Sequence, residues 1–232
     1  MERIDFMSNF IETYFKNVPP LRDEFIESTL QTLYMAGVTA LIAGVLGIIL
    51  GVILVVTDQG GILENKYLYS VLDKIINIFR SIPFIIMLAA IVPFTRWIAH
   101  TSIGTTAAIV PLVVGTTPFF ARQIQNALVE VDAGIIEAAQ SMGSSPLGII
   151  FRVYLKEGLN GIIRASSLTI INLIGLTAMA GAVGGGGLGN LAISRGYNRF
   201  NDDVTFVATL IILAIVFITQ AIGNYLIRKT SH

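Results

Sequence analysis

Five long apolar stretches limit what this chain can fold into more than any other feature of its sequence. They cover residues 33–56, 75–98, 103–121, 162–183 and 204–227. A helix needs about 20 apolar residues to cross the hydrocarbon core of a bilayer. Charged residues make up only 13% of the chain and the mean hydropathy is +0.76, whereas a soluble domain carries roughly 25% charge. The sequence therefore predicts an all-α membrane protein with five transmembrane helices.

The polar segments between these stretches are too short to form a separate soluble domain. The longest are residues 1–32 and 122–161. In the first, apolar residues recur at helical spacing between Phe6 and Phe15, which predicts an interfacial helix. We therefore divide the chain into an N-terminal interfacial and extracytoplasmic segment and a transmembrane domain over 33–232 that includes the second loop.

The basic residues predict the orientation, because Lys and Arg are enriched on the cytoplasmic side of a membrane. If the loop over 122–161 is cytoplasmic, nine of the 15 basic residues lie on that side, including Arg228 and Lys229 near the C-terminus. Five crossings place the two termini on opposite sides. We therefore predict a multi-pass protein with its N-terminus outside and its C-terminus in the cytoplasm.

The distribution of acidic residues narrows the mechanism. Every Asp and Glu lies outside the five stretches, and Asp73, for example, falls in a loop before the second one. Carriers driven by ions or protons usually hold acids within the membrane, so we disfavour that class. The sequence contains no His-Glu-x-x-His motif and no cysteine, and its net charge is +0. We therefore predict no catalytic residues, no metal site and no nucleic-acid partner.

Small residues and prolines predict how the stretches pack. Gly47 and Gly51 form a G-x-x-x-G step in the first stretch, and small residues at this spacing let helix backbones approach closely. The step suits contacts within the chain and a dimer seam equally. Pro83 and Pro93, in the second stretch, each remove a backbone donor. We expect them to bend a helix, which either shapes the bundle or leaves room for a pathway.

The fourth stretch is the most polar of the five. Thr169, Asn172, Gly175 and Met179 share about a third of the circumference of a helix at 3.6 residues per turn. An amide within the bilayer is costly unless it has a partner or faces water. Asn172 is therefore either an interhelical hydrogen-bonding group or a pathway-lining group, and both interpretations stay open. The flexible Met179, nearer the outer end, would suit a gate.

A glycine-rich segment, residues 181–189, follows the fourth stretch directly. Three of its glycines match G-x-G-x-x-G, but a dinucleotide site also needs a preceding strand and a following helix in a βαβ unit. Here the glycines end a membrane helix, so we reject the nucleotide interpretation. The segment, with Gly181 and Gly184 in it, supplies backbone freedom at the outer mouth. That freedom suits a hinge or a tightly packed re-entrant turn.

The loop over 122–161 holds the most patterned polar segment of the chain. Ser145 before Pro146 is a good helix start, so two short helices are predicted to meet at Gly143. Ala139 and Gly143 lie four residues apart, on one face, which permits close approach by another surface. We predict that this loop docks a partner through Glu137, Ala138, Ala139, Ser141, Met142 and Gly143.

The wider spacing of this loop resembles a known pattern. Glu137-Ala-Ala, three residues, Gly143, nine residues and then Val153-x-Leu155 resemble the coupling loop in the membrane subunits of binding-protein-dependent ATP-binding-cassette importers. In that pattern a proline comes next, and Lys156 stands in its place here. The docking positions therefore match, and the departure falls at the end of the second helix.

Three further segments, residues 79–84, 101–111 and 181–189, look like those of the methionine-importer permeases, a branch of the type I importers. The resemblance covers about residues 30–232. It implies a subunit of the bacterial inner membrane that pairs with a second copy of itself as a homodimer. Two cytoplasmic ATPase subunits, which hold ATP and Mg, would dock on the coupling loops, and an extracytoplasmic lipoprotein would deliver methionine. The chain itself would bind no cofactor and catalyse no reaction.

Other functions stay open at this point. A permease for another amino acid or small solute would have a similar sequence, because the separate binding protein largely selects the substrate. A self-sufficient secondary carrier would need no partner, and the absence of acids from the five stretches disfavours it. A membrane scaffold would move nothing, and the polar fourth stretch argues against it.

Overall fold

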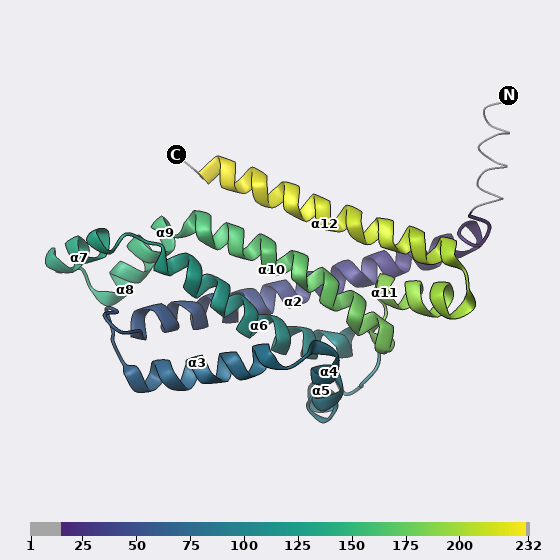
Figure 1. The fold of residues 1–232 in the computed structure, drawn as a ribbon, viewed down its shortest axis with the longest axis horizontal. Coiled ribbons are helices and arrows are strands. Elements are labelled where there is room, and N and C mark those ends of the chain that lie inside the picture. The colour runs from purple at the N-terminus through teal and green to yellow at the C-terminus, as the bar shows by residue number, and fades with distance from the viewer. Residues whose placement is uncertain (1–14, 231–232) are drawn as a thin grey trace. The chain divides into compact units, whose positions relative to one another are not determined.

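The computed structural model describes residues 15–230, and within this range every regular element is a helix (Figure 1). The long helices are α2 (Arg22–Thr57), α3 (Lys66–Ser81), α6 (Thr105–Val129), α10 (Leu159–Ala180) and α12 (Asp202–Thr230). The short ones are η1 (Pro19–Leu21), α4 (Phe84–Ala90), α5 (Val92–Ala99), α7 (Ala133–Ser141), α8 (Pro146–Ile149), η2 (Ile150–Tyr154), α9 (Leu155–Glu157), η3 (Gly181–Gly185), α11 (Gly187–Leu191), η4 (Ala192–Gly196) and η5 (Tyr197–Arg199). The interfacial helix predicted from Phe6 onwards falls outside the described residues.

Four of the five predicted spans are confirmed as helices long and apolar enough to cross a membrane. They occupy Pro19–Thr57, Thr105–Val129, Leu159–Gly185 and Asp202–Thr230. The first begins well before the predicted start at residue 33, because the polar residues after Pro20 continue the same helix. Asp23 and Glu24 lie in its first turn, where negative side chains stabilise the helix by interacting with the positive end of its dipole.

The second predicted span, 75–98, is not one helix. Its residues are divided among α3, α4 and α5, with breaks at Pro83 and around Ile91. Ile82 has an extended backbone, with φ −79° and ψ 123°, as expected for a residue that precedes proline. The prolines that were predicted to bend this helix instead end one helix and start another.

The chain divides into two compact units, each described by itself below. The first comprises the described residues up to Val38 together with Leu88–Leu112 and Leu173–Ile218. The second comprises Thr39–Met87, Val113–Asn172 and the described residues from Thr219 onwards. The predicted docking loop lies entirely in the second unit.

In the second unit, α2 and α6 pack in parallel through the predicted G-x-x-x-G step. A Cβ atom built on Gly47 would lie 2.6 Å from Phe120, and one on Gly51 would lie 2.6 Å from Ile124. Both helices advance by four residues from one contact to the next, so their chains run in the same direction. Of the two uses that the sequence left open for this step, the structure shows a contact within the chain.

Replacing Gly51 with alanine should loosen this contact. The new Cβ would also lie 2.8 Å from the Ala121 carbonyl oxygen, so the backbones must separate, and such overpacking typically costs about 1–3 kcal/mol. We expect a lower apparent Tm of the purified protein in detergent. Gly44→Ala on the same helix is the control, because a Cβ there meets nothing within 4 Å. Equal Tm values for the two variants would contradict the close approach.

Helices α3 and α4 run back along α6 in the opposite direction. Ile76 on α3 is buried with Ala121 on α6 and Leu54 on α2. Further along the chain, Phe84 and Met87 on α4 lie against Gly115, earlier on α6. As the residue numbers rise along α3 and α4, those of their contacts on α6 fall. The segment that connects α2 to α6 in the chain therefore runs antiparallel to both helices.

The first unit has its own core, formed by Phe25, Leu188, Leu191, Val204 and Ala208. Polar contacts tie its segments together at the surface. Arg195 donates to both carboxylate oxygens of Glu24, at 2.8 and 3.0 Å, and Asn17 donates through its backbone and side-chain nitrogens to Asp203. These contacts join the start of α2 to η4, and the segment before α2 to the first turn of α12.

Candidate functional site

The predicted meeting of two short helices at Gly143 is confirmed. Asp132 caps the start of α7 by accepting a hydrogen bond from the Gly134 amide at 2.7 Å. Ser145 caps α8 in the same way, accepting from the Gly148 amide at 3.2 Å, and Pro146 is the first helical residue. Figure 1 shows α7 and α8 next to one another in the second unit.

Gly143 ends α7 with a left-handed backbone, at φ +77°. The Ser144 amide donates to the Ala139 carbonyl oxygen at 3.1 Å, and the Met142 amide donates to that of Ala138 at 3.0 Å. This closure satisfies the last carbonyl groups of the helix, and it favours glycine because a Cβ makes the left-handed conformation costly. The helix therefore ends abruptly and leaves an exposed corner.

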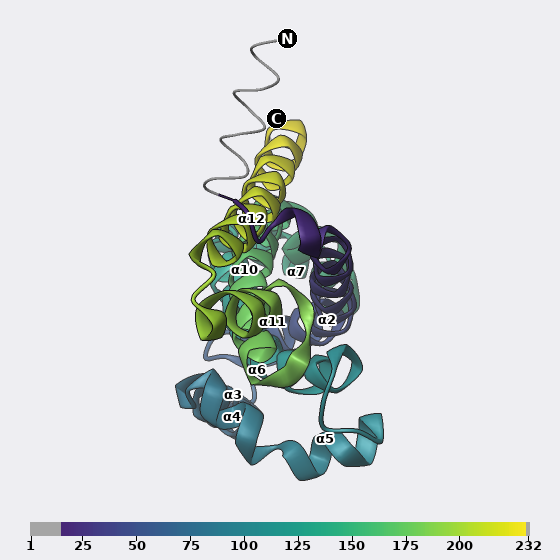
Figure 2. The same cartoon turned by 90° about the vertical axis from the view of Figure 1, so that its right-hand side faces the viewer.

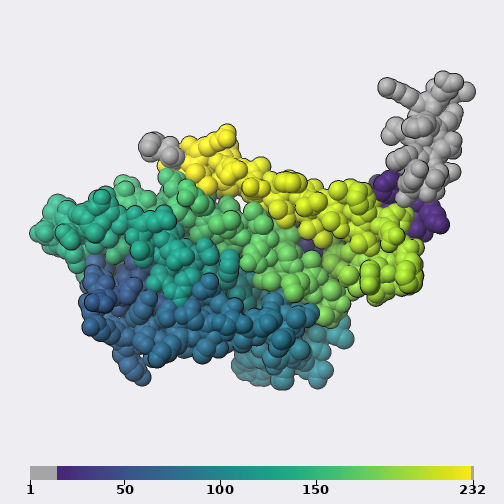
Figure 3. Space-filling view, viewed as in Figure 1, coloured from purple at the N-terminus to yellow at the C-terminus, as the bar shows by residue number. Residues whose placement is uncertain are grey.

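Most of the predicted docking residues lie on the outside of this corner. Glu137, Ala138, Ser141 and Gly143 are exposed, and Met142 is 78% exposed. The space-filling view shows α7 at the surface of the second unit (Figure 3). An exposed methionine and an exposed carboxylate offer a partner an adaptable apolar contact and a charge.

Ala139 does not share this exposed face. Its side chain is only 6% exposed and belongs to a core cluster with Leu128 of α6, Ile149 of α8 and Tyr154 of η2. The interpretation that Ala139 and Gly143 present one outward face is therefore wrong for Ala139. A small residue lets α7 lie close to the end of α6. Burial also raises the pKa of the Tyr154 phenol above its ordinary value.

The end of the second short helix continues without a break into α10. Val153 and Leu155 are partly buried against the same core cluster, whereas Lys156 is exposed. The chain stays helical through α9 and reaches α10 after a single residue, Gly158. Lysine keeps the backbone N–H and flexible φ that proline lacks, which is compatible with this continuation.

On α10, the four residues predicted to share a polar face separate into two groups. Thr169 is buried, and its hydroxyl donates to the Ala165 carbonyl oxygen at 2.8 Å within the same helix. Asn172, Gly175 and Met179 are exposed and follow one another at helical spacing. Within residues 15–230 the side chain of Asn172 makes no hydrogen bond. The shared face therefore holds for three of the four residues.

The glycine-rich segment forms a tightly packed turn, one of the two forms predicted for it. Gly184 has a left-handed backbone, at φ +98°. The Asn190 side chain donates to the Gly181 carbonyl oxygen at 3.2 Å. The amides of Gly187 and Leu188 donate to the side chains of Gln31 and Thr32 of α2, at 2.7 and 2.9 Å. Figure 2 shows α11 beside α2. These bonds fix the turn in place.

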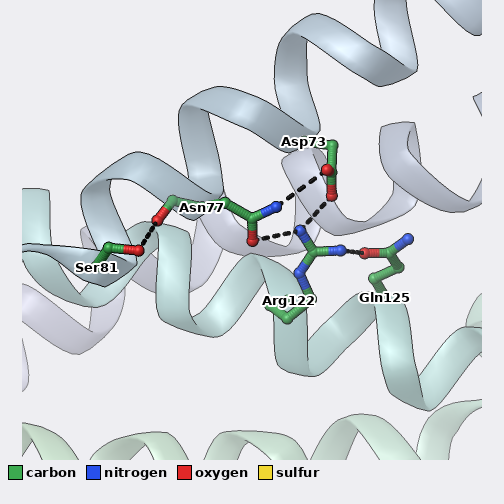
Figure 4. A network of polar contacts seen from close by, with 5 residues as sticks. All are labelled: Asp73, Asn77, Ser81, Arg122 and Gln125. Carbon is green, nitrogen blue, oxygen red and sulfur yellow. Dashed lines mark hydrogen bonds and ion pairs between the residues drawn. The ribbon is translucent and has the colours of Figure 1, made fainter.

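A polar network in the second unit was missed by the sequence interpretation. The guanidinium of Arg122 on α6 forms an ion pair with Asp73 on α3, and both residues had been assigned to loops (Figure 4). Asp73 lies in the middle of α3, so an acid is present within a helix of the bundle. The signal was available, because all polar residues of α3 fall within about a third of its circumference. They are Lys66, Ser70, Asp73, Lys74, Asn77, Arg80 and Ser81.

Comparison with known proteins places this geometry in a family. Residues 47–232 match the family described as the binding-protein-dependent transport system inner membrane component. The chain belongs to this permease family. The match takes in the exposed corner at Gly143, α10 and the glycine-rich turn.

Two curated relatives cover nearly the whole permease. The probable D-methionine transport system permease protein MetI of Pasteurella multocida is 49% identical over 205 residues, which are 88% of this chain and 94% of that protein. The methionine import system permease protein MetP of Bacillus subtilis is 48% identical over 213 residues, 92% of this chain and 95% of that protein.

Solved structures agree in fold. A structure of the MetNI methionine ABC transporter in inward-facing conformations contains a chain that matches this permease with a TM-score of 0.91 and 42% identity, over 93% of this chain and 100% of that one. An amino acid ABC transporter matches with a TM-score of 0.75 and 18% identity, over 90% and 95% of the two chains. The second likeness supports the fold alone.

Proposed function

We propose that this chain is the membrane-spanning permease subunit of an ATP-driven, binding-protein-dependent importer of methionine. The observation that carries the proposal is the near full-length match to methionine permeases in both sequence and structure. The permease itself provides the passage, and a separate ATPase hydrolyses ATP with Mg bound.

We propose that two ATPase subunits dock on the corner formed by α7 and Gly143, one on each permease of a homodimer. The contact residues would be the exposed ones, Glu137, Ala138, Ser141, Met142 and Gly143. Ala139 would hold α7 on the permease instead, because it is buried in the core cluster. ATP binding would then move α7, and α7 would move the helices packed against it.

The proposed topology has five crossings, with the broken helices α3, α4 and α5 together forming the second. Support comes from the second unit, where α2 and α6 run in parallel and the intervening part of the chain, α3 and α4, runs in the opposite direction. An odd number of crossings puts the two termini on opposite sides of the membrane. The distribution of Lys and Arg favours a cytoplasmic position for the corner at Gly143 and for the C-terminus, with the N-terminus outside. The extracytoplasmic binding lipoprotein would deliver methionine on that outer side.

The proposed passage runs along α10. Asn172, Gly175 and Met179 are exposed in the single chain at helical spacing, and an exposed amide suits a water-filled pathway better than lipid. Met179 would be the gate near the outer end. The packed turn that contains Gly181 and Gly184 would hold the outer end of α10 in position.

The decisive experiment measures ATP hydrolysis by the complex of this permease with its ATPase and binding protein in liposomes. We expect L-methionine with the loaded binding protein to stimulate hydrolysis and ATP-dependent uptake, and other amino acids to have little effect. Stimulation by a different amino acid instead would overturn the methionine assignment. Uptake by liposomes that hold the permease alone would show a self-sufficient carrier.

A further inference from the structure

The polar network in Figure 4 joins α3 to the part of α6 that leads to the coupling corner. Besides its ion pair with Asp73, Arg122 donates to Asn77 at 3.1 Å and to Gln125 at 2.5 Å. The Asn77 amide in turn donates to Asp73 at 3.0 Å. Both charges of the pair are mostly buried, with side-chain exposures of 15% for Arg122 and 27% for Asp73.

Arg122 lies on the part of α6 that packs against α7. The same stretch of α6 places Ile124 and Leu128 in the core cluster that holds Ala139 of α7, and α7 begins shortly after α6 ends at Val129. The end of α6 therefore packs against α7 through apolar side chains and is bound to α3 through Arg122. A displacement of α7 would reach α3 by this route.

Adhesion between α3 and α6 does not depend on the ion pair. Ile76, Leu54 and Ala121 form a fully buried apolar contact, with Leu72 and Tyr69 packed on it. A mostly buried ion pair adds little net stability compared with apolar packing, because both charges lose their hydration. A guanidinium held by several acceptors instead fixes the direction and register of α6 against α3.

We propose that Arg122 and Asp73 are positioning residues that make α3 and α6 move as one body when the ATPases drive α7. The inference rests on the proposed function and deepens it, because it names the residues that carry the movement of α7 onward to α3. Without the pair, the apolar contact would still hold α3 to α6, but α6 could slide or turn against α3. ATP would then be hydrolysed with less transport.

The test uses the complete complex in liposomes and measures methionine taken up per ATP hydrolysed. Energetic coupling between two sites typically changes the affinity at one of them by about 5- to 150-fold. By this scale, we expect the ratio of methionine to ATP to fall about fivefold or more for Asp73→Asn and Arg122→Gln. Stimulated hydrolysis and the apparent KM for loaded binding protein should change much less than this ratio, because neither residue lies in the proposed docking corner. The charge swap Asp73→Arg with Arg122→Asp should recover part of the ratio that Asp73→Arg alone loses.

The matched control is the ion pair of Glu24 and Arg195 in the first unit, whose side chains are 40% and 37% exposed. Glu24→Gln and Arg195→Gln should leave the ratio unchanged. The inference is overturned if the Asp73 and Arg122 variants keep the wild-type ratio, or if uptake and hydrolysis fall in equal proportion because less complex assembles. A wild-type complex without ATP-driven uptake would instead contradict the proposed function itself.

Discussion

Gly143→Trp is expected to abolish ATP-driven uptake while leaving the permease folded. A non-glycine residue in the left-handed conformation costs roughly 1–2 kcal/mol, and the indole would project from the exposed corner into the proposed docking surface of the ATPase. A loss of about 3 kcal/mol in docking free energy corresponds to about 100-fold weaker binding. Binding of purified ATPase to the variant and uptake by the reconstituted complex would measure the effect.

Gly60→Trp is the matched control for this variant. Gly60 has nearly the same backbone, at φ +78°, and like Gly143 it has nothing within 4 Å of a built Cβ. It lies in the loop between α2 and α3, outside the proposed docking corner. We expect Gly60→Trp to keep ATPase binding. Normal assembly and uptake by Gly143→Trp would refute the assignment of the corner as the docking site.

Gly189→Ala is expected to prevent the outer part of α10 from packing against α11. A Cβ on Gly189 would lie 2.2 Å from the Ala178 carbonyl oxygen and 2.6 Å from the Ala178 Cα. Both are backbone atoms, so no side chain can rotate away, and we expect a cost above about 3 kcal/mol. Little folded protein should be extracted from membranes, and its apparent Tm in detergent should be lower by many degrees.

Gly37→Ala in the same unit is the control, because a Cβ there meets nothing within 4 Å. It should express and melt like the wild type, or slightly better, since alanine favours a helix over glycine. If Gly189→Ala matched it, the turn would be a flexible hinge and not a packed turn.

The long helices could be predicted from the sequence because apolar length alone identifies a span. The corner at Gly143 could be predicted as a structure because Ser145, Pro146 and Gly143 are local signals for helix starts and ends. Both depend on properties of single residues or of neighbours in the chain. The long-range arrangement of α2 and α6 was only half predicted, because a G-x-x-x-G step shows close packing without naming the partner.

What the sequence interpretation missed depends on which side of a helix faces the rest of the chain. Ala139 and Gly143 lie four apart, but α7 turns Ala139 inward and Gly143 ends the helix. Thr169 falls near the exposed face of α10 by spacing, yet its hydroxyl is buried against its own helix. Asp73 was taken for a loop residue because the apolar criterion placed the start of the second span after it, although α3 begins at Lys66.

One face of α7 packs on the permease, and the other is exposed. Ile136 and Ala139 pack on the permease, whereas Glu137, Ala138 and Ser141 face outward between and beyond them. Selection can therefore alter the outward residues without disturbing the core. If the outward residues dock the ATPase as proposed, paralogous transporters in one cell could keep their ATPases apart by changing only these side chains. The same residues are where the ATPase of one importer would be matched to the permease of another.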